Sequence, residues 1–151
     1  MTTLFRTNAQ HADFTELVSQ LDADLAVRDG RDHAFYSQFN KLDLIKYAVV
    51  AYLDDQPCGC GAIKAFDPKT MEIKRMFVKP QHRGKRVAFQ LLTELEQWAA
   101  ELGYDRCVLE TGYKQPEAIS LYEKSGYQII PNYGQYAGVA NSVCFEKRLK
   151  E

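Results

Sequence analysis

The sequence predicts a single mixed α/β (α+β) sheet with helices on its faces, and three observations support this fold class. The chain has 151 residues, about the usual size of one domain, and 46% of them are hydrophobic, which is enough for a self-sufficient core. The first half contains consecutive strand-like segments joined by turns, as in antiparallel hairpins. The second half alternates strands with amphipathic helices. Together these patterns predict one α/β domain over residues 1–151.

The first part of the chain predicts one strand, one helix and a segment of mixed character. Residues 4–7 form a short strand candidate, and Asp13 followed by Glu16 has the pattern of a capping box that opens a helix. We expect this helix to end before Gly30. Residues 29–46 mix aromatic positions typical of a short helix with acidic positions typical of a polar loop. The apolar face of the predicted helix is Phe14, Leu17, Val18, Leu21 and Leu25.

Three antiparallel strands follow. Residues 47–53 are rich in Val and Tyr, and a turn at residues 54–57 leads into a second strand over residues 58–66. These two segments therefore predict a hairpin. After a further turn, residues 71–78 add the third member of the antiparallel set.

The character of the sequence then changes to alternating helices and strands. Residues 86–102 predict an amphipathic helix, because their apolar positions recur at helical spacing and Gly103 provides a stop. Residues 107–109 predict a short buried strand. Pro116 suits the first position of a second helix, which Gly126 ends. The last two predicted strands are residues 127–130 and 142–149.

Composition excludes several classes of protein. The formal net charge is −1 with 26% charged residues, which argues against disorder and against a nucleic-acid binder. The amino terminus has no apolar segment of a signal peptide, and no stretch approaches the roughly 20 apolar residues of a membrane span. We therefore expect a cytoplasmic protein that binds neither nucleic acid nor membranes.

The cysteines indicate reduced, buried thiols and no metal. They lie in apolar or strand-like stretches, without a second pair at metal-ligand spacing and with only three histidines in the chain. None is placed convincingly for a covalent acyl-enzyme. The four are Cys58, Cys60, Cys107 and Cys144.

A basic loop between a strand and a helix is the clearest candidate for an anion site. Residues 79–86 separate the strand ending at Val78 from the next helix, whose first backbone N–H groups are unpaired at the positive end of the helix dipole. Gly84 lets this backbone approach an anion closely. The alternatives are an exposed basic loop without a ligand, and a protein whose function is to bind phosphate or nucleic acid through this basic region. The basic residues of the region are Lys74, Arg75, Lys79, Arg83, Lys85 and Arg86.

The second half of the chain resembles the GNAT N-acetyltransferase superfamily. The family's acetyl-CoA signature, Arg/Gln-x-x-Gly-x-Gly/Ala, corresponds to residues 83–88, with similar segments upstream at residues 71–78 and downstream at residues 116–127. The resemblance implies a mostly antiparallel sheet of six to seven strands with helices on both faces. It also implies direct acetyl transfer from acetyl-CoA to an amine in a ternary complex, without a metal.

The resemblance also implies a set of cofactor-binding residues. Splayed strands would expose the backbone of residues 76–78 to the pantetheine arm. The signature's first glycine is Arg86 here, so its side chain either crowds the loop or adds a charge-assisted bond to a phosphate. The implied set is Met76, Phe77, Val78, Arg83, Gly84, Lys85, Arg86, Val87, Ala88, Gln115, Ala118, Leu121, Tyr122 and Lys124.

Three side chains are candidates for acid–base chemistry. Tyr122 matches the helix tyrosine that lies near the CoA sulfur in this family, so its phenol would be the general acid; alternatively it is a core aromatic. Glu72 and Glu110 are candidate general bases at neighbouring strands. The alternatives are an exposed strand residue paired with a lysine for Glu72, and an ion pair with Arg75 or Lys114 for Glu110.

The acceptor is expected to be a small-molecule or peptide amine bound by residues 29–46 and 131–136. Tyrosines would form its wall and aspartates would attract an ammonium, although a packed loop and surface charges explain the same residues. A homodimer is compatible with the family. A catalytically silent acyl-CoA-binding module remains the alternative function. The candidate acceptor residues are Tyr113, Tyr133, Tyr136, Asp29 and Asp32.

Overall fold

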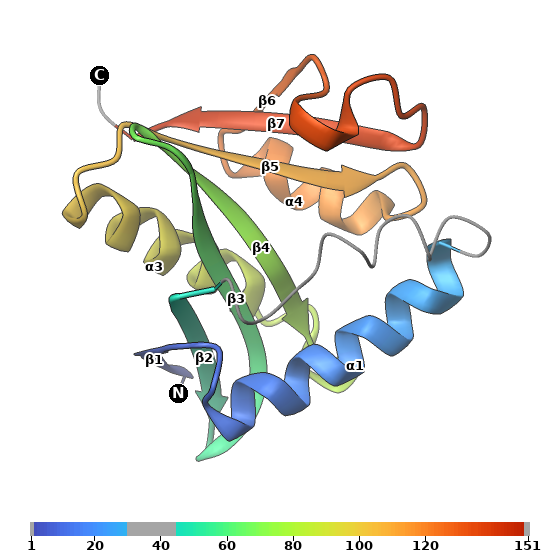
Figure 1. Ribbon diagram of the computed structural model, residues 1–151. Helices are drawn as coiled ribbons and strands as arrows, with labels where there is room; N and C mark the ends of the chain where they lie inside the picture. The colour runs from blue at the N-terminus through green and yellow to red at the C-terminus, as the bar shows by residue number, and fades with distance from the viewer. Residues whose placement is uncertain (1, 30–44, 150–151) are drawn as a thin grey trace.

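A seven-stranded sheet forms the centre of the computed structural model, which describes residues 2–29 and 45–149 (Figure 1). The strand order is β1-β2-β3-β4-β5-β7-β6, and every neighbouring pair is antiparallel except β4 and β5. The mixed, mostly antiparallel α/β fold class is therefore confirmed. The strands are β1 (Thr2–Thr7), β2 (Tyr47–Leu53), β3 (Gln56–Asp67), β4 (Thr70–Val78), β5 (Arg106–Gly112), β6 (Gln128–Ile130) and β7 (Ser142–Arg148).

Helices cover both faces of the sheet (Figure 1). Helix α1 (Ala12–Asp29) packs on β2, β3 and β4 through a core that includes Phe14 and Leu17. Helices α3 (Val87–Glu101) and α4 (Pro116–Lys124) contribute to a second core on the opposite face. Gly61 lets α3 approach, because a Cβ there would lie 2.7 Å from the Leu95 side chain. The described residues also include two short 3₁₀ helices, η3 (Pro80–His82) and η4 (Gly134–Tyr136).

Strands β4 and β5 diverge after a short parallel contact. They pair only where residues 70–72 of β4 meet residues 106–108 of β5. Beyond Glu72, β4 therefore has no ladder partner on the side of β5, and Figure 1 shows the two arrows separating toward their C-terminal ends. The splayed strands that the family resemblance implies are confirmed.

A β-bulge in β4 lies where the strands diverge. Three residues of β3, from Cys60 to Ala62, span the same length as four of β4, from Phe77 to Lys74. Arg75 takes up the extra residue with a left-handed φ of 60°, which L-residues adopt only at a cost. The bulge changes which face the following side chains reach, and it lies beside the candidate site.

The predicted start of the first helix is wrong in one respect. The helix begins at Ala12, and Asp13 lies inside it, so the expected capping box does not form. The carboxylate of Asp13 instead accepts a hydrogen bond of 2.6 Å from the Tyr52 hydroxyl on β2. A tertiary partner has thus replaced the local one. The other predicted strands and helices are present with small changes at their ends, whereas most of the mixed segment, residues 30–44, lies outside the described residues.

Candidate functional site

Two cavities meet beside the divergence of β4 and β5. The larger is a groove of about 610 Å³ between β4, the loop after it, α3 and α4. The smaller has a volume of about 110 Å³ and lies between α1, β4, β5 and η4. Leu21, Met76 and Tyr122 line both cavities, so these residues mark the junction.

The loop before α3 presents unpaired backbone amides to the groove. Gly84 and Arg86 both have left-handed φ values, 82° and 65°, and Arg86 is the N-cap of α3 without a capping side-chain bond. The first helical hydrogen bond is donated by Gln90 to the Arg86 carbonyl. The amides of residues 87–89 therefore precede the helical ladder at the positive end of the helix dipole. This geometry suits an anion such as a pyrophosphate.

The two arginines of the loop have different contacts. The Arg83 Nε donates a 3.0 Å hydrogen bond to the Val78 carbonyl, which fastens the loop to the end of β4. The Arg86 guanidinium lies over the ring of Phe89, with its Cζ 4.8 Å from the ring centroid. Both residues are exposed and line the groove. Arg86 thus extends along α3 rather than filling the space above the amides.

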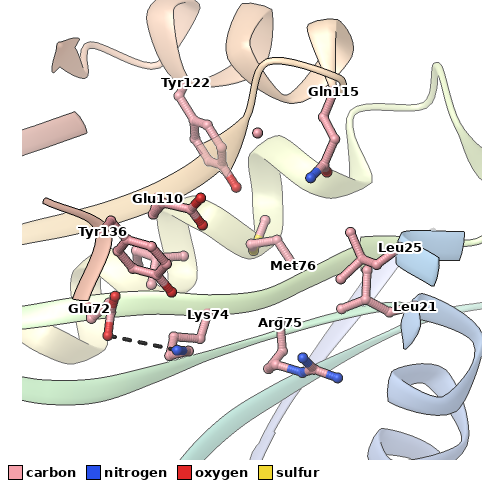
Figure 2. A pocket seen from close by; sticks show the side chains of 12 residues that line it. Leu21, Leu25, Glu72, Lys74, Arg75, Met76, Glu110, Gln115, Tyr122 and Tyr136 are labelled. Atoms are coloured by element: carbon pink, nitrogen blue, oxygen red, sulfur yellow. Dashed lines mark ion pairs between the residues drawn. The ribbon is translucent and has the colours of Figure 1, made fainter. Parts of the chain in front are cut away.

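Most of the residues predicted to bind the cofactor line this groove. Gln115 is different: it lines the smaller cavity, and Figure 2 shows its side chain directed there. Lys85 is exposed in the loop and is not among the lining residues. The predicted residues that line the groove are Met76, Phe77, Val78, Arg83, Gly84, Arg86, Val87, Ala88, Ala118, Leu121, Tyr122 and Lys124.

Tyr122 is a buried phenol at the junction of the two cavities. Helix α4 begins at Pro116, which suits its first position, and carries Tyr122 two turns later with 6% of the residue exposed. Its ring packs against Tyr127 and Phe145 at centroid distances of 5.8 and 5.9 Å. Burial, and secondly the charge of Glu110, raise the pKa of the Tyr122 phenol well above its usual value. The hydroxyl therefore keeps its proton at neutral pH and is available as a donor.

Glu110 lies on β5 and faces the junction. Figure 2 shows its carboxylate between Tyr122 and Tyr136, at the wall of the smaller cavity. After burial, the charge of Glu110 is the next cause of the raised pKa values of both tyrosines. The side chain is half-buried. Its position lets it accept a proton from a group bound in this cavity.

Glu72 is already engaged by two neighbours. Its Oε2 accepts a 2.7 Å hydrogen bond from the Tyr133 hydroxyl, and its Oε1 lies 4.0 Å from the Lys74 Nζ. Only 7% of Glu72 is exposed, so the alternative of an exposed strand residue is wrong, although the lysine partner named with it is present. Burial raises the pKa of the Tyr133 phenol far above its usual value, and the charge of Glu72 adds to this effect. Glu72 therefore forms a fixed part of the wall.

The candidate acceptor residues separate into three groups. Tyr133 and Tyr136 form an edge-to-face pair at 5.8 Å, and Tyr136 lines the smaller cavity. Tyr113 is 62% exposed and is not among the lining residues of either cavity. Asp29 ends α1 and its side chain is not described, while Asp32 lies outside the described residues.

Six lining residues of the smaller cavity had no predicted role there: Leu21, Leu25, Ile73, Lys74, Arg75 and Gly112. The two cations were assigned to the basic loop by their place in the sequence, but the bulge directs them toward α1 and the smaller cavity. Arg75 pairs with Asp22 on α1. The helical spacing of the two leucines predicted a core face and could not show that its end borders a cavity.

Three further observations concern the cysteines, metal ligands and helices of the described residues. All four cysteines are buried thiols without disulfides, as predicted. Within residues 2–29 and 45–149, no group of three or more His, Cys, Asp or Glu residues is arranged to hold a metal ion. In the same part of the chain, no helix has the length and apolarity to span a membrane.

Comparison with known proteins gives a consistent family. The model of the acetyltransferase (GNAT) family matches residues 11–127. The chain is 38% identical over 101 residues, 66% of its length, to the uncharacterised N-acetyltransferase YsnE of Bacillus subtilis. It spans 67% of the length of that relative and smaller shares of other curated relatives, down to 29%.

Solved structures share the fold over nearly the whole chain. A protein described as an acyl-CoA N-acyltransferase from Klebsiella pneumoniae is 30% identical with a TM-score of 0.83, and the match covers 99% of this chain and 98% of that one. A GNAT family acetyltransferase from Elizabethkingia anophelis, solved with acetyl-CoA bound, is 18% identical with a TM-score of 0.71, and the match covers 97% of each chain. At that identity the second match shows the fold alone.

Proposed function

Since this chain belongs to the acetyltransferase (GNAT) family, we propose that it transfers an acetyl group from acetyl-CoA directly to an amine in a ternary complex. The acceptor is a small-molecule or peptide amine. The observation that carries the proposal is the position of Tyr122, a buried and protonated phenol where the cofactor-sized groove meets the smaller charged cavity.

The residues of the groove fit acetyl-CoA. The amides of residues 87–89 and the loop cations would hold the pyrophosphate, and Lys124 would add a further positive charge near the nucleotide. The backbone of β4 beyond Glu72 is not paired with β5, so it can form hydrogen bonds with the pantetheine arm. Such an arm would lead the thioester toward Tyr122 and the smaller cavity.

The acid and base roles follow from the two groups at the junction. Glu110 would take the proton that the amine loses as its nitrogen bonds to the acetyl carbon. Tyr122 would donate its proton to the sulfur as the C–S bond breaks, so that free CoA leaves as a thiol. The engaged carboxylate of Glu72 would shape the acceptor side of the cavity rather than carry the proton.

Direct transfer is supported by the state of the thiols. Burial raises the pKa of Cys60 and Cys107 to about 12 and that of Cys144 to about 11. Thiols with such pKa values contain very little thiolate at neutral pH, and the thiolate is the nucleophile. A covalent acyl-enzyme on these cysteines is therefore disfavoured, and the amine is left as the attacking group.

The experiment that tests the proposal compares the wild-type protein with Tyr122→Phe. We expect calorimetric titration to show that both bind acetyl-CoA with similar affinity, because the ring and its aromatic contacts are kept. Turnover, followed by release of the CoA thiol with a panel of amines, should fall about 100- to 10,000-fold in the variant. Equal turnover would remove Tyr122 from the mechanism.

A silent acyl-CoA-binding module predicts a different result. Such a protein would bind acetyl-CoA through the basic loop and release no thiol with any amine. Pantetheine without the nucleotide serves as the ligand control, because it lacks the phosphates that the loop would bind. Failure to bind acetyl-CoA at millimolar concentration would refute both functions.

A further inference from the structure

The smaller cavity contains two cations that the acetyl transfer does not use. Lys74 and Arg75 are consecutive residues of β4, and regular alternation would send them to opposite faces of the sheet. The left-handed backbone of Arg75 breaks this alternation, and both residues line the cavity. Backbone strain of this kind is concentrated at functional sites, where it aims a side chain.

The guanidinium of Arg75 is buried with one donor left over. The residue is only 5% exposed, and its Nη2 donates a hydrogen bond to the Asp22 carboxylate on α1. Its Nε has no hydrogen-bond partner among the described residues. A buried donor without a partner is unfavourable, so a ligand that supplies an acceptor oxygen there gains the corresponding free energy. A carboxylate is such a ligand, because it only accepts and matches the planar guanidinium.

The other charges of the cavity favour a ligand that is both positive and negative. Glu72 and Glu110 line the same cavity as Lys74 and Arg75, so charged groups of both signs are present there. Figure 2 shows Arg75 on the side of α1 and Glu110 with Tyr122 on the opposite side. An ammonium group is attracted to the carboxylates and a carboxylate to the arginine. A phosphate dianion would instead meet two carboxylates within the same small space.

We propose that the acceptor is an amine that carries its own carboxylate, as a free amino acid does, and that Arg75 binds that carboxylate. This inference rests on the proposed acetyl transfer and narrows its substrate class. The volume of about 110 Å³ is that of a few water molecules, which suits the polar end of a small molecule. Leu21 and Leu25 provide an apolar surface for the remainder of the acceptor.

Matched acceptors test the proposal without any variant. The twenty common amino acids are each compared with the corresponding amino acid amide, which keeps the amine and side chain but lacks the negative charge. Turnover is followed by release of the CoA thiol. Each rate is corrected for the fraction of the amine that is neutral at the pH of the assay. We expect kcat/KM for the best acid to exceed that of its amide about 10- to 100-fold, the range of a charge-assisted hydrogen bond.

Variants then assign the preference to one side chain. Arg75→Gln should reduce the ratio of acid to amide to about threefold or less, because kcat/KM for the acid falls far more than kcat/KM for the amide, while affinity for acetyl-CoA stays close to wild type. Arg75→Lys, which keeps the charge but not the planar fork, provides a second variant with an intermediate ratio. Asp22→Asn is the matched control, because it removes the partner of Arg75 and leaves the guanidinium in place. The control should keep the preference for the acid.

Several outcomes would overturn the inference. If amides are acetylated as efficiently as acids, the site does not recognise a carboxylate. Thiol release itself would still support the acetyl transfer. If the ratio of acid to amide is the same in Arg75→Gln and Asp22→Asn, the preference does not depend on the Arg75 guanidinium. Its ion pair with Asp22 would then be only structural. If acetyl-CoA binds but neither acids nor amides are acetylated while simple amines are, the substrate class is wrong. Absence of thiol release with every amine would refute the proposed function itself.

Discussion

The hydrogen bond between Tyr133 and Glu72 allows a quantitative prediction about the wall of the acceptor cavity. Removing the hydroxyl in Tyr133→Phe leaves the ring and its edge-to-face contacts with Phe66 and Tyr136 in place. What is lost is a 2.7 Å bond to a carboxylate that is only 7% exposed. Hydrogen bonds to charged groups contribute about 1.5 to 3 kcal/mol, and we expect a loss of about 2 kcal/mol in the free energy of unfolding.

The change is large enough to measure by thermal and urea unfolding. For a chain of this size, about 2 kcal/mol corresponds to a fall in Tm of about 4 to 8 °C. Tyr113→Phe is the matched control, because Tyr113 is 62% exposed and the same loss of a hydroxyl there should change stability by less than about 0.5 kcal/mol. An equal fall in Tm in Tyr133→Phe and Tyr113→Phe would show that the buried hydrogen bond stabilises the protein no more than an exposed hydroxyl does.

A double-mutant cycle isolates the interaction itself. Glu72→Gln keeps the shape of the side chain and removes its charge, so the double variant with Tyr133→Phe reports the coupling of the two groups. We expect a coupling energy of about 1 to 2 kcal/mol. A value below about 0.5 kcal/mol would refute the argument that the phenol stabilises the carboxylate. In the proposed enzyme, Tyr133→Phe should also raise the KM for the acceptor and leave the affinity for acetyl-CoA unchanged.

Three further predictions concern the loop, the thiols and the tyrosines. Arg86→Ala should weaken binding of CoA more than binding of dephosphorylated pantetheine in calorimetry, and equal weakening would mean that Arg86 only shapes the loop. Cys60 and Cys107, with pKa values raised to about 12 by burial, should react with a thiol reagent at pH 8 only after unfolding; rapid labelling of the native protein contradicts this. Burial raises the pKa of Tyr52 to about 12 and that of Tyr127 well above its usual value, so the folded state keeps phenolic protons that the unfolded chain loses near pH 10. The free energy of unfolding in urea should therefore fall as the pH rises above 10, and constant stability between pH 8 and 11 would refute this.

Local signals in the sequence predicted the elements of the sheet well. Residues 47–53, for example, form β2 with the expected bounds. In the same way, Pro116 begins helix α4, because its fixed φ suits the first helical position. Such signals depend on neighbouring residues alone. The capping box at Asp13 failed for the opposite reason, because its carboxylate is taken by Tyr52, a partner 39 residues away.

The acceptor side of the site depended on contacts that no local pattern encodes. Glu72 and Tyr133 are 61 residues apart, and only the folded sheet brings them together. Lys74 and Arg75 were grouped with the basic loop because they are close to it in sequence. Their actual position follows from a bulge whose left-handed residue is an arginine, where a glycine would have indicated the turn in advance.

The two left-handed arginines lie at opposite ends of one segment and connect the two cavities of the site. Arg75 is at the bulge of β4 beside the smaller cavity, and Arg86 is at the N-cap of α3 beside the groove. A left-handed backbone costs an L-residue about 1 to 2 kcal/mol, which a glycine would avoid. The contact of Arg86 with Phe89 offsets only about 0.5 to 1 kcal/mol of this at an exposed site. The strain is explained if each guanidinium binds an anion, the phosphates of CoA at Arg86 and the carboxylate of the acceptor at Arg75. Because Arg86 is exposed, Arg86→Gly should then maintain or increase stability while weakening only the affinity for CoA, and an equal loss of affinity for the acceptor would refute this division of roles.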